Sequence, residues 1–328
     1  MPHRPFRRTG CQLTKGQRTA PRATVLINRG GGAAASDDDI AAKVQEALDR
    51  AGVAAKVELI DGGQAEARCQ AIVKRGDPLL IVGGGDGTIS AAAGAAAGSK
   101  TRLGILPLGT LNHFARDLGI PADFDEAAAV IAAGAEQRVD LAEMNGRVFI
   151  NNSAVGLYPL MVVDREIQQK RLGRSKRLAM AVASIRTLVR FGSQRLALTV
   201  NDEQARIDTP LLFVGNNDYQ LELPAAGKRE SLTDGNLCVL VLRKKTRAGF
   251  ILAAARALFG RARRDDMVRL DDVQRLRVGS GRQRLAVSLD GEVLRVEPPL
   301  EYRIRKQALR VIAPAPKAEG QTKAPQGK

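Results

Sequence analysis

One short stretch constrains the fold of this chain more than any other, an apolar run that stops at three glycines. Leu79-Leu80-Ile81-Val82 is continuous and hydrophobic, which is typical of a strand buried on both faces of a sheet. Gly83-Gly84-Gly85-Asp86-Gly87-Thr88 follows it, and Ile89 to Ala97 then has helical character. A glycine turn between a buried strand and a helix offers unpaired backbone N–H groups to an anion. The stretch therefore predicts a phosphate-binding turn in an α/β fold.

Residues 23–146 repeat this alternation of strands and helices. The predicted strands lie at 23–27, 54–60, 79–82 and 103–106, and the predicted helices at 37–51, 65–74 and 89–97. Strands that alternate with helices pair in parallel and are covered by the helices. We therefore predict an α/β N-terminal domain over 23–146, a parallel sheet with helices on both faces.

From about residue 147 the pattern changes to short strands separated by turns. These strands are predicted at 148–153, 196–200, 211–214, 237–242, 285–289 and 302–304, with two helical insertions between them. Such spacing indicates a mostly antiparallel second domain over 147–313. Residues 1–22, which are basic, and 314–328 are predicted to be disordered tails, and whether 1–22 are a native start stays open.

The net charge of +16 is concentrated in three segments. Residues 1–22, 170–195 and 243–264 hold six, eight and eight Lys or Arg and no acid. Basic patches of this kind attract nucleic acid or anionic lipid. The aromatic content of 3%, without Trp, disfavours a platform for single-stranded nucleic acid. If 172–191 is helical, Lys176, Arg186 and Arg190 share one face, which predicts docking on an anionic membrane; a solvated helix face is the alternative.

Cysteine usage and hydropathy indicate the compartment. Cys11, Cys69 and Cys238 are odd in number and widely separated, which fits neither a disulfide framework nor a zinc site. The sequence has no apolar run of the roughly 18 residues that a membrane span requires. We expect a cytoplasmic protein that contacts the inner face of the membrane peripherally.

A second glycine loop follows the next predicted strand. Gly109 and Thr110, after Leu103 to Leu106, can present a backbone N–H and a hydroxyl to a phosphate. Two such loops on consecutive strands of one sheet would line the same crevice.

Four blocks of sequence together resemble the diacylglycerol kinase catalytic family, which includes bacterial soluble lipid kinases and the sphingosine kinases. The blocks are GGGDGT, LGILPLGTLNHFARDLGIP, VDLAEMNGRVFINNSAVGLYP and SLDGEV, in order between about residues 23 and 312. Similar GGDGT turns occur in NAD kinases and phosphofructokinases, whereas the PLGTLN and DGE blocks favour lipid kinases. The resemblance implies a nucleotide-binding α/β domain, a β-sandwich domain and an active site between them.

The resemblance also implies roles for individual residues. Glu292 corresponds to the general base for a lipid hydroxyl, and Asp86 to a residue that arranges nucleotide and metal. Magnesium would bind at Asp234, with main-chain carbonyls near Ser231 and Asn236 completing its coordination. With the two glycine loops, the predicted nucleotide-binding set is Asn28, Gly84, Gly85, Asp86, Gly87, Thr88, Gly109, Thr110 and Asn112.

Several positions depart from the family pattern. His113 stands where many relatives have Asp, and Cys238 where some have a second Asp near the metal, so either change could weaken metal binding. Without the family, Asp86 is a helix N-cap and Asp290-Gly291-Glu292 a hairpin turn.

From these features we predict an ATP- and Mg²⁺-dependent kinase that phosphorylates a diacylglycerol-like or related glycerolipid at the membrane surface. The alternatives are an NAD kinase-like enzyme and a catalytically dead protein that binds nucleotide or anionic lipid. Nucleic acid is not an expected partner. The sequence identifies neither the acceptor lipid nor the oligomeric state.

Overall fold

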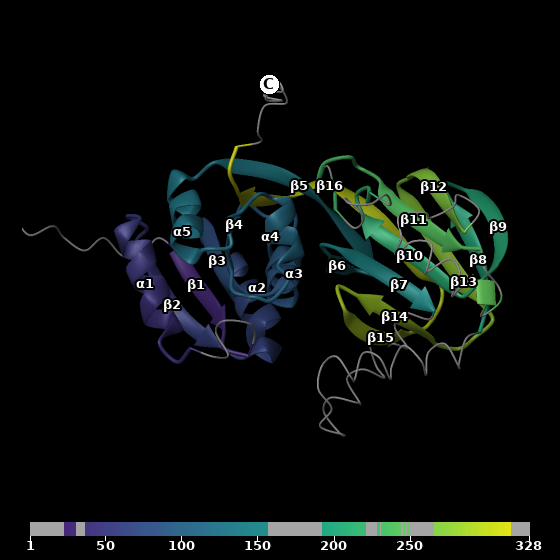
Figure 1. Ribbon diagram of the computed structural model, residues 1–328, viewed down its shortest axis with the longest axis horizontal. Helices are drawn as coiled ribbons and strands as arrows, with labels where there is room; N and C mark the ends of the chain where they lie inside the picture. The colour runs from purple at the N-terminus through teal and green to yellow at the C-terminus, as the bar shows by residue number, and fades with distance from the viewer. Residues whose placement is uncertain are drawn as a thin grey trace, which may run out of the picture.

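The computed structural model describes residues 23–30, 37–156, 192–220, 228–229, 231–243, 246, 248–249 and 266–315. Two parts lie side by side, a helix-rich N-terminal part and a C-terminal part built from strands (Figure 1). Both predicted tails, apart from residues 314 and 315, and the predicted basic face with Lys176, Arg186 and Arg190 fall outside the described residues. Among the described helices, none has both the length and the apolar character needed to cross a membrane.

The N-terminal part is a parallel sheet between two layers of helices, as predicted. Its strands run in the order β2-β1-β3-β4, and every pairing among them is parallel. Helices α1 and α5 pack together, as do α2 and α3. The chain passes from β1 to β2 in one direction along the sheet and from β2 to β3 and β4 in the other. Because such crossovers are right-handed, these two pairs of helices lie on opposite faces of the sheet. The bounds are β1 Ala23–Asn28, α1 Ile40–Arg50, β2 Ala55–Ile60, η2 Gly62–Gln64, α2 Ala65–Arg75, β3 Leu79–Gly84, α3 Asp86–Ala96, β4 Arg102–Pro107, α4 His113–Asp117 and α5 Phe124–Ala133.

Helix α3 begins earlier than the sequence indicates. The expected start at Ile89 is wrong, because Gly85 is the N-cap and Asp86 already lies in the first turn. An acidic residue is favoured there by the unpaired N–H groups and the dipole of the helix. The turn between β3 and α3 is therefore short, and Gly87 and Thr88 belong to the helix.

The C-terminal part contains two packed sheets. Six strands form an antiparallel sheet in the order β12-β11-β10-β7-β14-β15, while β16, β13, β8 and β9 extend the N-terminal sheet. Between the sheets, the Phe149 and Tyr302 rings meet edge to face at 6.3 Å. The bounds are β5 Glu136–Met144, β6 Arg147–Phe149, β7 Asn152–Gly156, β8 Gln194–Val200, β9 Glu203–Thr209, β10 Leu211–Asn216, β11 Leu237–Leu242, β12 Met267–Val273, β13 Arg275–Ser280, β14 Leu285–Leu289, β15 Glu292–Val296 and β16 Leu300–Ile312.

The chain changes sheets at residues 150–151. A single strand over 148–153 was expected, and that expectation is wrong, because β6 pairs with β5 in one sheet and β7 with β10 and β14 in the other. The two residues between them belong to neither ladder. This crossing places the side chain of Asn151 within 3.4 Å of Asp86, in the first turn of α3.

One long strand joins the two parts. Residues 302–304 were expected as a short strand, but β16 spans 13 residues and pairs with β13 and β5 along its length. Near its end Val311 pairs in parallel with Leu103 of β4. A ten-stranded sheet therefore runs across residues 146 and 147, where the sequence suggests a domain boundary, and that division stays a prediction.

Candidate active site

The two glycine loops are in direct contact. They follow β3 and β4, which pair through Gly84 and Pro107. A Cβ at Gly109 would overlap the Cα of Gly85, so the second loop has no room for a side chain at this point. Leu108 N also donates to Gly84 O at 3.2 Å. The structure therefore brings together the two loops at one edge of the sheet.

Asn28, at the end of β1, lies in the same corner. Its Nδ2 donates to Thr88 Oγ1 at 2.9 Å, and its Oδ1 accepts from Gly30 N at 3.0 Å. A side chain at Gly84 would collide with Thr88, which is 5% exposed. Asn28, Gly84 and Thr88 thus form a packed support beneath the turn, with Gly87 exposed above it.

The second loop is held by its own asparagine. Asn112 has a positive φ of 49°, and its Nδ2 donates to Pro107 O at 3.1 Å and Gly109 O at 2.8 Å. Its Oδ1 accepts from Gly109 N at 3.0 Å. The side chain therefore shapes the loop from within, while Thr110 is exposed at its tip.

Asp86 connects the two loops. Its carboxylate accepts from His113 N and Phe114 N, both at 3.2 Å, at the start of α4. It also accepts from Asn151 Nδ2 at 3.4 Å. The first turn of α3 thus caps the neighbouring helix α4. A capping role was the alternative considered for Asp86, but the structure places it on α4 and not on its own helix.

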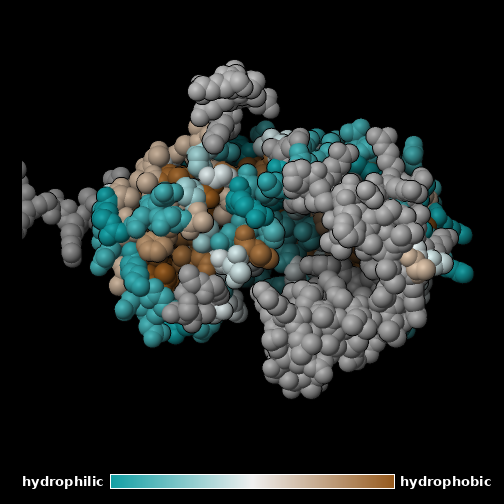
Figure 2. All heavy atoms as spheres, in the orientation of Figure 1, coloured by the Kyte–Doolittle hydropathy of each residue, from teal (hydrophilic) through white to brown (hydrophobic). Residues whose placement is uncertain are grey.

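A cleft of about 790 Å³ opens beside the first loop. Its walls come from α2 and α3, from β6 and from the turn between β14 and β15. Gly85, Gly87 and Thr88 line one side and Glu292 the other, whereas Gly109, Thr110 and Asn112 do not line it. On the face shown in Figure 2, the described surface near the junction of the two parts carries hydrophilic and hydrophobic residues side by side.

Glu292 faces the first glycine loop, which is the candidate phosphate-binding turn, across this cleft. The side chain is exposed, and a Cβ at Gly87 would lie 4.0 Å from its Oε1. The carboxylate can therefore accept a proton from a group held in the cleft beside Gly87. The hairpin interpretation of Asp290-Gly291-Glu292 is also correct, since these residues join β14 to β15.

Asp290 lines the cleft beside Glu292, and its carboxylate holds the backbone of the sheet crossing. Its Oδ1 accepts from Asn151 N at 2.8 Å and Asn152 N at 3.1 Å, and its Oδ2 from Ile150 N at 2.8 Å and Ser90 Oγ at 2.7 Å. Burial raises the pKa of the Asp290 carboxyl, and these hydrogen bonds oppose the rise. Asp290 therefore fixes the turn that carries Glu292 against both α3 and residues 150–152.

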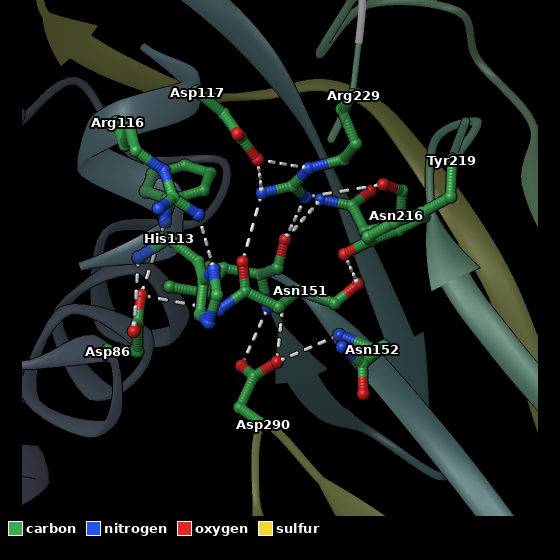
Figure 3. Close-up of polar contacts among 12 residues, drawn as sticks. Asp86, His113, Arg116, Asp117, Asn151, Asn152, Asn216, Tyr219, Arg229 and Asp290 are labelled. Atoms are coloured by element: carbon green, nitrogen blue, oxygen red, sulfur yellow. Dashed lines mark hydrogen bonds and ion pairs between the residues drawn. The ribbon is translucent and has the colours of Figure 1, made fainter. Parts of the chain in front are cut away.

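Arg229 is a buried cation that the sequence gives no reason to select. Its guanidinium pairs with Asp117 at 2.7 Å, and both side chains are almost fully buried. Nη2 donates to Asn151 Oδ1 at 2.9 Å and Nη1 to Ile150 O at 2.6 Å (Figure 3). A buried cation needs such full pairing, so this residue firmly fixes α4 to the C-terminal part.

The candidate magnesium residues lie in a different loop. Ser231, Asp234 and Asn236 do not line the cleft, and Gly235 N of this loop donates to Asp140 Oδ2 at 2.8 Å. Asp234 is exposed, and among the described residues its carboxylate accepts one hydrogen bond, a long one of 3.4 Å from Asp218 N. One carboxylate with nearby carbonyls suits magnesium, which retains much of its water. No cluster of three His, Cys, Asp or Glu suited to a metal occurs among the residues that the structure describes.

The sequence matches two family models that together cover most of the chain. Residues 22–144 match the diacylglycerol kinase catalytic domain. Residues 161–313 match the YegS C-terminal NAD kinase beta sandwich-like domain. Residues 22–144 of this chain belong to the diacylglycerol kinase catalytic family. The family assignment makes it a kinase, and the two-part fold predicted from the sequence is the fold of this family.

Individual relatives agree with the family assignment. A diacylglycerol kinase of Bacillus subtilis (strain 168) is 27% identical over 283 residues, which are 85% of this chain and 92% of that protein. One from Staphylococcus saprophyticus is 28% identical over 197 residues, 59% of this chain and 64% of the relative. A crystal structure of a diacylglycerol kinase from Bacillus anthracis str. Sterne superposes with a TM-score of 0.64 at 20% identity, covering 89% of this chain and 97% of that one. This last similarity shows the fold.

Proposed function

We propose that this kinase transfers the terminal phosphoryl group of ATP to the hydroxyl of a diacylglycerol-like glycerolipid. The observation that supports the proposal best is the position of Glu292, an exposed carboxylate across the cleft from the Gly84–Thr88 turn. Phosphoryl transfer depends mainly on positioning and on charge stabilisation. A proton acceptor facing a phosphate-binding turn is the arrangement that this chemistry requires.

In the proposed reaction the first turn of α3 and the exposed Thr110 bind the ATP phosphates. Glu292 takes the proton from the lipid hydroxyl as the hydroxyl oxygen attacks the terminal phosphorus of ATP. The bond from that phosphorus to the bridging oxygen breaks, and ADP leaves. Asn28, Asp86 and Asn112 hold the loops in place, since their side chains are engaged with protein groups.

Magnesium would neutralise charge at the ATP phosphates. In the 231–236 loop it would link strands. Asp234 is the residue best suited to hold it in that loop, with carbonyls near Ser231 and Asn236. Because this loop does not line the cleft, a metal held there by Asp234 would stabilise the loop itself. The Asn236 carbonyl already accepts from Asn217 N at 3.2 Å, which orders the loop around Asp234.

The lipid would be taken from an anionic membrane. Basic residues near an anionic leaflet contribute roughly 1 kcal/mol each, so Lys176, Arg186 and Arg190, which the sequence predicts on one helix face, would hold the enzyme at the surface. Changing all three to Glu should weaken binding to phosphatidylglycerol-containing liposomes. Unchanged liposome binding would remove these residues from the proposal.

Labelled ATP, incubated with the enzyme and fractionated bacterial lipids, tests the function directly. We expect label in a lipid product, which mass spectrometry then identifies. Labelled NAD without labelled lipid would instead support the NAD kinase-like alternative. Nucleotide binding without any phosphorylated product would support the dead-site alternative.

A further inference from the structure

Residues 150–152, where the chain crosses between the sheets, form a hydrogen-bonded junction. All three backbone N–H groups donate to Asp290. The Ile150 carbonyl accepts from Arg229 at 2.6 Å and from Asn216 Nδ2 at 3.0 Å. The Asn151 carbonyl accepts from Tyr219 OH at 3.0 Å. The junction is therefore fixed on one side to the turn that carries Glu292 and on the other to Arg229.

The side chain of Asn151 extends this junction to the glycine loops (Figure 3). It is 6% exposed, and it lies between an anion and a cation. Its Nδ2 donates to Asp86 at 3.4 Å and its Oδ1 accepts from Arg229 at 2.9 Å. Because a carboxylate can only accept and a guanidinium can only donate, one orientation of the amide satisfies both neighbours.

Helix α4 is held at both ends by the same set of residues. Asp86 accepts the N–H groups of His113 and Phe114 at its start, and Arg229 pairs with Asp117 at its end. The guanidinium also lies 5.8 Å from the centre of the Phe114 ring. Asn151 contacts both Asp86 and Arg229, so it connects the two clamps of the helix that follows the second glycine loop.

We propose that Asn151 is a positioning residue, which sets the distance between the phosphate-binding loops and Glu292. Its side chain holds Asp86 and α4, while its backbone holds Asp290, two residues before Glu292. This role rests on the proposed kinase function. An error of about 1 Å in the placement of reacting groups lowers turnover roughly 100-fold, so loosening this connection should reduce kcat and leave ATP binding nearly unchanged.

The variant Asn151→Asp separates this role from simple packing. The new carboxylate has the same shape and keeps an acceptor for Arg229, but it faces Asp86 without an N–H to donate. We expect kcat to fall about 100-fold at pH 8, with the Kd for ATP changed less than about threefold. The deficit relative to wild type should shrink as the pH falls, because a proton shared by the two carboxylates restores the missing hydrogen bond.

Other charged or ionisable groups face this position in both proteins. They are Arg229, Asp117, His113, Asp290 and Tyr219, and Glu292 lies beyond Asp290. Dividing the activity of the variant by that of wild type at each pH cancels their common contributions. A ratio that is constant with pH, or wild-type turnover at pH 8, would overturn the proposal.

Asn151→Ala is the second variant, and Tyr302→Phe is the matched control. The alanine variant should show a similar loss of kcat that does not depend on pH, since it adds no carboxylate. Tyr302→Phe removes a buried bond of 3.0 Å to Ser153 in the same inter-sheet region, and it should keep wild-type kcat. Equal turnover in Asn151→Ala and wild type, or loss of ATP binding together with turnover, contradicts the positioning role. Wild-type enzyme that phosphorylates no lipid refutes the proposed function instead.

Discussion

Two Asp-Gly turns, one from each part of the molecule, flank the same cleft and use their aspartates alike. Asp86 of the N-terminal part accepts backbone N–H groups from α4, and Asp290 of the C-terminal part accepts them from residues 150–152. In both turns a following residue, Gly87 or Glu292, faces the cleft. A carboxylate in such a turn can thus organise a backbone while its neighbour meets the substrate.

The two aspartates differ in how tightly they are held. The hydrogen bonds to Asp290 are 2.7 to 3.1 Å long and enclose its carboxylate, whereas those to Asp86 are 3.2 to 3.4 Å. Removing either carboxylate leaves backbone N–H groups without an acceptor. The resulting loss in the free energy of unfolding grows with the burial of those N–H groups. The C-terminal turn should therefore depend more strongly on its aspartate than the N-terminal turn.

The largest effect is expected at Glu292. Glu292→Gln removes the proton acceptor and keeps the shape, so kcat should fall by about 10² to 10⁴-fold while ATP binding stays near wild type. Steady-state turnover and calorimetric nucleotide binding measure the two quantities. Glu297→Gln is the control, because Glu297 is an exposed residue just past β15 that pairs with Arg284. Similar losses in both variants would show that Glu292 is not the base.

Comparing Asp290→Asn with Asp86→Asn tests the difference between the two turns. The amide at 290 would turn an N–H₂ group toward backbone and hydroxyl donors, so we expect a loss of about 2 to 3 kcal/mol in the free energy of unfolding. At Asp86 the loss should be about 1 kcal/mol, as for other helix caps. Urea denaturation monitored by circular dichroism gives both values. The reverse order would contradict the ranking.

A smaller effect is expected where the glycine loops touch. Gly109→Ala forces the backbone away from Gly85 and should destabilise the protein by about 1 to 2 kcal/mol, as other overpacked sites do. Because the loops separate, ATP binding should weaken as well. Gly281→Ala, with open space around its Cα and an ordinary φ, is the control. Unchanged ATP affinity in Gly109→Ala would show that the second loop does not contribute to nucleotide binding.

The smallest effect concerns the two buried thiols, one in each part. Burial raises the pKa of Cys69 to about 12 and also raises the pKa of Cys238. Neither thiol should react with a thiol reagent at pH 8 until the protein unfolds. Because β16 belongs to the sheet that joins both parts, the two thiols should become reactive at the same urea concentration, as shown by peptide mapping after pulsed labelling. Different midpoints would show that the parts unfold separately.

The N-terminal part was largely predictable from the sequence. Of its first four strands, β1, β3 and β4 contain short apolar runs and β2 alternates apolar and polar residues, and the glycine loops mark the ends of β3 and β4. The C-terminal part was harder, because pairing over long sequence separations decides its strands. The strand β9, Glu203–Thr209, is polar and lies at the sheet edge, and β5, β12, β13 and β15 were also not predicted. Their local composition does not distinguish them from loops.

The residues of the candidate site divide in the same way, into those that the local sequence identifies and those that only long-range contacts identify. The glycine turn could be selected from its own residues and spacing, and Glu292 from the resemblance of its DGE block to the family. Arg229 and Asn151 could not, because their importance comes from partners far away in the sequence. The expected strand over 148–153 is wrong for the same reason, since the change of sheet between β6 and β7 follows from tertiary pairing.

The pairing of Val311 with Leu103 has a consequence for synthesis on the ribosome. The β4 edge of the parallel sheet has no partner until β16 emerges, about 200 residues later, which is roughly 10 to 40 s at ordinary elongation rates. During that interval the nascent chain carries an open strand edge beside a buried apolar surface, a template for intermolecular pairing. We expect chains stalled before residue 300 to bind chaperones or aggregate, and chains released after β16 to escape both.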